Sequence, residues 1–457
     1  MQKKDVINYL EKISDNVEKL AYNIWNNPEI SGEEKNSANL FREILNSNDF
    51  QINEINEMEN AFVAEYGKGS PVIAILGEYD ALPGLSQSLD TKFNPVILNG
   101  PGHGCGHNLL GSGALGSALA IKEYLYRTNT SGTLRFYGCP KEETLNGKVE
   151  MIKEGAFEGC DIALSWHPLN VNSAMREAYL ANNSIKFKFH GISSHAAQSP
   201  ESGRSALDAV ELMNVGANYL REHVIDKARI HYTITNAGGS PNIIPKEAES
   251  WYYIRAPYRE DVEEITKRLF KIAEGAALMT ETMVEYQVIS GCYEMLPNDI
   301  LHNLTYENMV EIGIPEYTRE EIEFAKALQE TLDQKSVENE IRKVVSSNEN
   351  KKSYIHHSII DKNDPVSLTS SSDSGDVSWI MPMNLLLTAC WPLGVAAHSW
   401  QATASSGSSM GMKGMMYAAK VLTGVTYDLL NNPNLVDNAK TEFQNRTEKT
   451  KYISPLK

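Results

Sequence analysis

An unbroken apolar run at 72–76, Val-Ile-Ala-Ile-Leu, constrains the fold of this chain more than any other feature. A run without polar interruptions is typical of a parallel strand that is covered on both faces. Further strands are predicted at 133–137 and 161–165, and helices at 108–126 and 147–156 alternate with them. This alternation predicts an α/β fold around a mixed, mostly parallel sheet.

Each of these strands is followed by side chains that can bind a metal ion. In chain order they are Glu78 with Asp80, Glu142 with Glu143, and His167. Ligands of open α/β sheets gather at the carboxyl ends of the strands. A single histidine or glutamate there is usually a solvated side chain. Three coincident strand ends are much harder to explain without a ligand.

A glycine-rich loop between the first two strands adds a thiol and imidazoles. It reads Gly100-Pro-Gly-His-Gly-Cys-Gly-His-Asn-Leu-Leu-Gly111. Cys105 and His107 are two residues apart, so their side chains can point to the same side of extended backbone, and both suit zinc-like cations. The alternative is that Cys105 is a small buried hydrophobe and that His103 and His107 are polar loop residues.

A second pattern occupies residues 181–293. It consists of strands at 184–190, 229–236, 248–255 and 282–290 with helices at 204–221 and 259–276. This β-α-β-β-α-β order predicts an inserted ferredoxin-like α+β domain. The flanking segments, 1–180 and 294–457, would then form one discontinuous catalytic domain. At its beginning, an amphipathic helix is predicted at 3–26, and Ser31-Gly-Glu-Glu34 has the pattern of a capping box for the next helix.

The composition excludes several partners. The formal charge of -17, from 42 basic and 59 acidic residues, argues against nucleic acid or an anionic membrane, because both need basic surfaces. The most apolar segment, 109–121, is too short to span a bilayer, and no signal peptide is visible. Five cysteines in 457 residues indicate a reducing compartment. We therefore expect a cytoplasmic protein.

The motifs, taken in order, resemble those of the zinc-peptidase-like amidohydrolases, which include aminoacylases, indole-acetyl-amino-acid hydrolases and bacterial carboxypeptidases. The resemblance extends from about residue 10 to residue 425 and depends on the whole ordered set. The motifs are Gly77-Glu-Tyr-Asp-Ala-Leu-Pro83, Gly102-His-Gly-Cys-Gly-His107, Glu142-Glu143, His167, His195, Asn242-Ile-Ile-Pro245 and His398. The resemblance implies a catalytic domain with an inserted lid domain, through which the protein dimerises.

The resemblance also implies a centre of two divalent metal ions per subunit, zinc or manganese. Its ligands would be Cys105, His107, Glu143, His167 and His398. Glu142 would be the general base, and Asp80 would orient a ligand. Glu78 stands where relatives carry either a ligating histidine or a non-ligating aspartate, so its role stays open. Asn108 replaces the aspartate of many relatives, which could alter the hydrogen bonds around His107.

Three residues of the inserted domain match substrate-binding positions of the family. His195 would reach across a two-fold dimer to polarise the scissile carbonyl, with Asn242 and Arg255 as its partners in binding substrate. The guanidinium of Arg255 suits an α-carboxylate. Without the resemblance, His195 and Arg255 would be ordinary polar residues of a loop and a strand.

The function implied is metal-dependent hydrolysis of an N-acyl, aminobenzoyl-type amide of an amino acid such as glutamate, by metal-activated water. A dipeptidase or a general N-acyl-amino-acid deacylase would use the same chemistry. A homodimer through the lid domain is expected, with hetero-assembly with a related subunit as an alternative. A partner subunit or binding module inactive alone is the non-enzymatic alternative. A thiol-dependent hydrolase fails, because Cys105 sits in a full ligand set rather than beside one orienting histidine.

Overall fold

The computed structural model describes residues 1–176, 179–344, 353–363 and 368–456. The chain folds into two compact units. The first unit contains Met1–Ala178, Leu296–Leu368 and Val377–Tyr452, and the second contains Tyr179–Met295, Thr369–Asp376 and Ile453–Lys457. The predicted lid domain at 181–293 falls within the second unit.

The first unit is built on a seven-stranded mixed sheet in the order β1-β2-β4-β3-β5-β11-β6. The four inner strands β4, β3, β5 and β11 are parallel, whereas β1, β2 and β6 are joined by antiparallel pairing. The prediction of an α/β fold with a mostly parallel sheet is therefore confirmed. The strands are β1 (Gln51–Glu54), β2 (Phe62–Lys68), β3 (Val72–Glu78), β4 (Gly132–Cys139), β5 (Ile162–Leu169), β6 (Ser173–Ala174) and β11 (Met383–Ala389).

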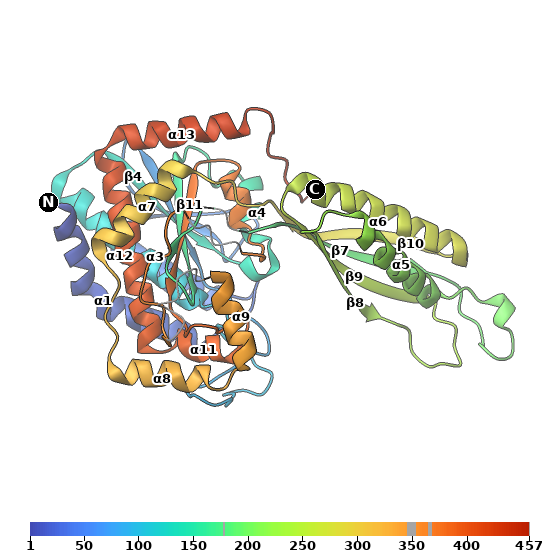
Figure 1. Cartoon of the computed structure of the whole chain (residues 1–457). Coiled ribbons are helices and arrows are strands. Elements are labelled where there is room, and N and C mark those ends of the chain that lie inside the picture. The colour runs from blue at the N-terminus through green and yellow to red at the C-terminus, as the bar shows by residue number, and fades with distance from the viewer. Residues whose placement is uncertain (177–178, 345–352, 364–367, 457) are drawn as a thin grey trace. The chain divides into compact units, whose positions relative to one another are not determined.

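Three long helices pack together beside this sheet: α1 (Lys3–Asn26), α3 (His107–Thr128) and α12 (Ser409–Asn431) (Figure 1). Helix α3 is buried almost all round and contacts β3, β4 and β5. At Gly111 a side chain is excluded, because a Cβ there would lie 2.5 Å from the carbonyl oxygen of Glu78. This close approach brings the start of α3 beside the end of β3, where the predicted ligands meet.

The first unit also has shorter helices, with α10 at its boundary with the second unit. They are α2 (Lys35–Ser47), α4 (Gly147–Lys153), α7 (Asp299–Ile312), α8 (Arg319–Gln329), α9 (Gln334–Val344), α10 (Ser374–Ser378), α11 (Trp400–Ser406) and α13 (Pro433–Thr447). Within the described residues, no helix has the length and apolar character needed to cross a bilayer.

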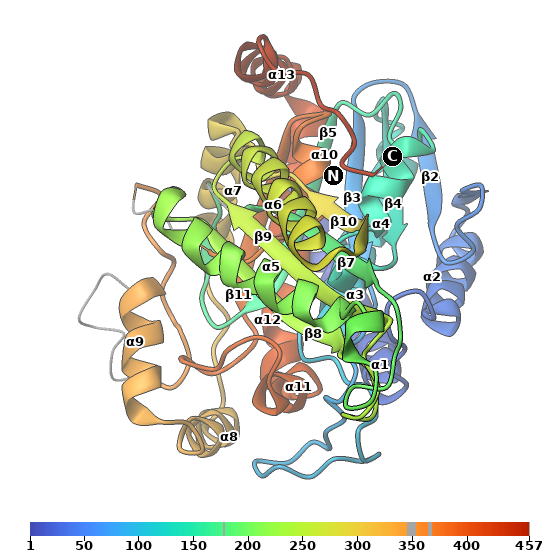
Figure 2. The same cartoon turned by 90° about the vertical axis from the view of Figure 1, so that its right-hand side faces the viewer.

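The second unit contains a four-stranded antiparallel sheet in the order β10-β7-β9-β8, with α5 and α6 side by side on one face (Figure 2). Its elements are β7 (Ala181–His190), α5 (Ala206–Leu220), β8 (Arg229–Asn236), β9 (Glu247–Ala256), α6 (Arg259–Thr280) and β10 (Met283–Cys292). With β7 as the first strand, this is the 4-1-3-2 order of a ferredoxin-like unit, in agreement with the prediction. The apolar faces of both helices and the sheet form a separate core.

The structure differs from the sequence-based expectations in several local features. The antiparallel strands β1 and β2 were not predicted, since their sequences alternate poorly. The strand predicted at 161–165 continues to Leu169, so His167 lies within β5. The prediction of a capping box at Ser31 is wrong, because α2 begins at Lys35. The Ser31 hydroxyl donates instead to Asp80, 2.7 Å away.

Candidate metal centre and active site

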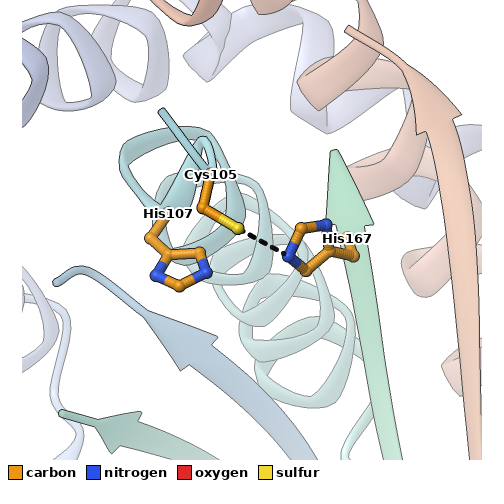
Figure 3. A group of neighbouring side chains, drawn as sticks. All are labelled: Cys105, His107 and His167. Carbon is orange, nitrogen blue, oxygen red and sulfur yellow. Dashed lines mark hydrogen bonds between the residues drawn. The ribbon is translucent and has the colours of Figure 1, made fainter. Parts of the chain in front are cut away.

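Cys105 and His107 flank the start of α3. Gly106 between them has a left-handed backbone (φ 75°), which a glycine adopts without strain, and α3 begins at His107. The Cys105 sulfur lies 3.5 Å from Nε2 of His167 on β5, and the His107 ring stands edge-on to the His167 ring (Figure 3). Two elements that are far apart in the sequence thus bring one thiol and two imidazoles together.

Three overlapping groups of potential ligand atoms occupy this place, each with its atoms within 4.8 Å of one another. They are Cys105 with His107 and His167, Cys105 with Glu143 and His398, and Glu78 with His107 and Glu142. The structure therefore brings together all five residues predicted as ligands, the predicted base Glu142, and Glu78. His398 is the most exposed of them, and its Nε2 lies 3.4 Å from Oε2 of Glu143.

Asp80 organises two of these residues through hydrogen bonds. It accepts from Nδ1 of His107 at 2.8 Å, from the backbone N–H of Glu143 at 2.9 Å, and from the Ser31 hydroxyl. Because Nδ1 carries the donated proton, Nε2 of His107 faces the cluster. In the same way, Nδ1 of His167 donates to the carbonyl of Pro168 at 2.7 Å and leaves Nε2 directed at Cys105. The Nε2 atoms of both rings are thus the ones presented to a cation.

Glu142 and Glu143 lie in a single 3-10 turn, Glu142–Thr144, that follows β4. The residues on either side of this turn, Lys141 and Leu145, both have left-handed backbones with φ of 59°, and His398 has φ of 61°. Non-glycine residues in this conformation cost about 1–2 kcal/mol each. Such strain clusters at functional sites, where the surrounding structure holds it.

Burial dominates the electrostatics of the site. It raises the pKa of Glu143 to about 7 and the pKa of the Cys105 thiol well above its usual range. Burial together with the His107 charge lowers the pKa of His167 to about 4. For Asp80, burial opposes ionisation, but the charge and hydrogen bond of His107 outweigh it and lower the pKa to about 2. Asp80 is therefore ionised, while a nearby positive charge would favour the ionised forms of Cys105 and Glu143.

Several buried atoms of the cluster have no hydrogen-bond partner among the described residues. They are Oε2 of Glu78, Nε2 of His107 and Oε1 of Glu143. Buried polar atoms are normally paired, so unpaired ones that converge on one place need an explanation. A thiol, three imidazoles and carboxylates suit zinc and manganese as donors. The residues present therefore fit divalent metal ions.

Two residues of the site are not predicted by the sequence. Ser31 has the pattern of a helix cap, and Lys148 belongs to no motif. Lys148 is fully buried, and its Nζ lies 2.6 Å from Oε1 of Glu78. Lys148 stands at the start of the predicted helix 147–156, and no pattern there predicts its burial, since lysine is almost always exposed.

Two neighbouring residues of the loop turn away from the cluster. His103 is buried, with Nε2 at 3.2 Å from the carbonyl of Ile24, and burial lowers its pKa to about 3. Asn108 donates through its amide to the carbonyls of Ala21 and Ser406. An aspartate could not make these two bonds, so Asn108 serves the packing of α3.

The predicted substrate-binding residues belong to the second unit. His195 and Asn242 lie on adjoining loops, since the backbone N–H of Ala196 donates to the carbonyl of Asn242 at 3.0 Å. Nδ1 of His195 accepts from the backbone N–H groups of Ala197 and Gln198, and the ring is exposed. This leaves its Nε2–H as a donor. Arg255 lies on β9, and its Nε is buried without a hydrogen-bond partner among the described residues.

Comparison with known proteins agrees with this architecture. Residues 182–280 match the peptidase dimerisation domain of the M20 peptidases. The chain is 42% identical to one of the subunits of p-aminobenzoyl-glutamate hydrolase from Escherichia coli over 450 residues, which cover 96% of this chain and 94% of that protein. It is 26% identical to the mouse Xaa-Arg dipeptidase, over 97% of this chain and 93% of the relative.

Among solved structures, the chain resembles a dinuclear metal-binding peptidase of the M20 family from Bacillus subtilis. The TM-score is 0.61 at 15% identity, over 92% of this chain and 99% of the other. At that identity the likeness concerns the fold.

Proposed function

The chain belongs to the M20 family of metal-dependent amidohydrolases, and from this premise we propose that it cleaves the amide bond of an aminobenzoyl-type acyl amino acid, p-aminobenzoyl-glutamate in the first place. The single observation that carries the proposal is the convergence of one thiol, three imidazoles and adjacent carboxylates in the first unit. The 42% identity to the p-aminobenzoyl-glutamate hydrolase of Escherichia coli supports the choice of substrate.

In this proposal two divalent cations, zinc or manganese, are held by one thiolate, three imidazoles and one carboxylate. The proposed ligands are Cys105, His107, Glu143, His167 and His398. When bound, the cations activate water for attack and polarise the amide carbonyl. The unpaired buried atoms of His107 and Glu143 support this assignment. Asp80 acts by holding the His107 ring so that Nε2 stays directed at the cluster.

Glu142 is the proposed general base. It is buried, and its Oε2 lies 3.8 Å from Nε2 of His107. Its carboxylate accepts a proton from the attacking water and transfers it to the leaving amine nitrogen. Glu143 beside it, turned toward His398, serves as the ligand. One turn of chain thus supplies both the ligand and the base.

The second unit supplies the proposed substrate contacts. The Nε2–H of His195 donates to the oxygen of the scissile carbonyl, Asn242 assists it, and Arg255 binds the α-carboxylate. We propose that His195 comes from the second subunit of a homodimer formed through this unit. The dimerisation-domain match and the edge strand β8, whose residues other than Ile230 are exposed, support the dimer.

The test is release of p-aminobenzoate from p-aminobenzoyl-glutamate by the zinc- or manganese-loaded protein alone, with Glu142→Gln as the control. Release by the wild type, and loss of about 100-fold or more in a variant that keeps its metal, is the expected result. Equal turnover by Glu142→Gln would remove Glu142 from the mechanism. Absence of turnover by a protein that holds two metal ions would exclude this substrate for the chain acting alone.

A second candidate is a dipeptidase or a general N-acyl-amino-acid deacylase, which the similarity to the Xaa-Arg dipeptidase favours. Dipeptides and N-acetyl amino acids in the same assay distinguish this candidate from the first.

The bacterial relative is named as one subunit of its enzyme, so a related partner subunit is an alternative to a chain that is active alone.

None of the five cysteines forms a disulfide in the structure, which supports a reducing, cytoplasmic location.

A further inference from the structure

A buried ion pair adjoins the proposed metal centre. Nζ of Lys148 lies 2.6 Å from Oε1 of Glu78, and the side chains are 0% and 3% exposed. Lysine and glutamate are almost never fully buried unless they are paired. Taking both charges out of water costs several kcal/mol per ion, so the pair is a poor way to stabilise a fold. Its position calls for another reason.

The pair leaves one carboxylate oxygen pointing into the cluster. Lys148 contacts Oε1 of Glu78, whereas Oε2 is buried and lies 3.4 Å from Nε2 of His107. Neither Oε2 of Glu78 nor Nε2 of His107 has a hydrogen-bond partner among the described residues. Two tetrahedral ligands at about 2.1 Å from a zinc ion lie about 3.4 Å apart. The two atoms are therefore spaced as ligands of one cation.

The chain places Lys148 by a close backbone contact. Lys148 is the second residue of α4, and a Cβ at the preceding Gly147 would lie 1.7 Å from the carbonyl oxygen of Pro140. Only glycine permits this approach, which seats the first turn of α4 against the chain that follows β4. The lysine is consequently directed inward and not to solvent.

The charges of the site also require a cation such as Lys148. When ionised, the thiol and four carboxylates of the cluster carry five negative charges, which belong to Cys105, Glu78, Asp80, Glu142 and Glu143. Two divalent cations balance four of them, and Lys148 balances the fifth. Without Lys148, a loaded site would keep a buried, uncompensated negative charge.

We propose that Lys148 is a positioning residue that holds Glu78 as a sixth metal ligand, beside His107. This inference rests on the proposed function, because it assumes a two-metal centre, and it assigns the role that the sequence left open for Glu78. Lys148 fixes one oxygen of the carboxylate and so directs the other at the cation. Residues that orient ligands typically change metal affinity by about 10–100-fold when they are replaced.

The experiment is a titration of the metal-free protein with Co²⁺, compared among the wild type, Glu78→Gln, Lys148→Met and the double variant. The near-ultraviolet thiolate band reports the cation bound to Cys105, and the visible bands report coordination number. We expect Glu78→Gln and Lys148→Met to weaken one of the two equivalents about 10–100-fold while the thiolate band persists. Lys153→Met, an exposed lysine of the same helix, should bind as the wild type does.

The double variant separates a metal role from a structural one. Removing both charges should restore the stability that Lys148→Met loses by leaving Glu78 unpaired, and it carries the test if that variant fails to fold. It should not restore metal affinity. Wild-type affinity for both equivalents in Glu78→Gln or in the double variant would overturn the inference. Two equivalents in the wild type without amide hydrolysis would refute the proposed substrate but leave this assignment intact.

Discussion

Replacement of Asp80 by asparagine tests whether hydrogen bonding sets the metal-binding form of His107. The carboxylate accepts at Oδ1 from Nδ1 of His107, and at Oδ2 from Ser31 and from the backbone of Glu143. An amide has one oxygen, which is best used where two donors converge. Its NH₂ group then faces Nδ1 of His107. The Nδ1–H then keeps only the backbone carbonyl of Asp80 as an acceptor, 3.1 Å away. The competing tautomer, in which Nδ1 accepts from the amide and the proton lies on Nε2 facing the cluster, becomes more favourable.

The expected loss follows from this contact. A hydrogen bond to a charged acceptor contributes about 1.5–3 kcal/mol. If that energy is lost only in the metal-binding form, affinity falls about 10–100-fold, since each 1.4 kcal/mol is a factor of ten. Substitutions of residues that orient histidine ligands have effects of the same size. The hydrophobic core is not touched, so the overall fold should persist.

The assay is competition between the protein and a chromogenic chelator for zinc, with the far-ultraviolet circular dichroism as a check of folding. Ser31→Ala is the matched control, because it removes one donor to Asp80 but keeps the bond to His107. We expect this control to lose less than about tenfold in affinity. Zinc binding by Asp80→Asn as tight as that of the wild type would refute the tautomer argument.

Three further outcomes are expected. His195→Ala should lower kcat about 100-fold or more without changing metal content or the dimer, and unchanged kinetics would exclude a contact with the carbonyl. Chelation should abolish turnover, and added zinc or manganese should restore it; hydrolysis that persists in chelator would contradict a metal mechanism. Burial raises the pKa of Glu294 in the second unit from 4.5 to about 7, so the folded state favours the protonated carboxyl. Its contribution to the free energy of unfolding is at most about 3 kcal/mol, and it is lost as the pH rises from about 4.5 through 7. Glu294→Gln should flatten that part of the pH profile of chemical denaturation, and an unchanged slope would show that Glu294 does not titrate as expected.

The elements that carry the site were predictable because buried strands and helices have recognisably apolar sequences. Strand β3 is covered on both faces and therefore reads as an apolar run, and the same holds for the long helix α3. The ligands follow these elements at the carboxyl ends of parallel strands, so their convergence was expected from topology. By contrast, β1 and β2 lie at one side of the sheet, and their mixed exposure gives no regular pattern.

Partnerships between distant side chains were not predictable. Ser31 precedes a helix in the way a capping residue does, and only the fold shows that its hydroxyl donates to Asp80, 49 positions away. Lys148 resembles any lysine at the start of a helix, and only the close approach of Gly147 to Pro140 shows that it is directed inward. In both cases local sequence preference was overridden by a tertiary contact worth more than the local alternative.

Forming this cluster costs folding free energy, so folding of the first unit should be coupled to metal binding. Lys141, Leu145 and His398 hold left-handed backbones, and Glu143 is kept away from solvent in a place that opposes its ionisation. None of these features stabilises the fold by itself. A cation that replaces the protons on the Cys105 thiol and the Glu143 carboxyl removes this opposition, so the free energy of metal binding offsets the strain. Metal should therefore raise the unfolding temperature of the first unit, and Glu78→Gln should reduce that increment.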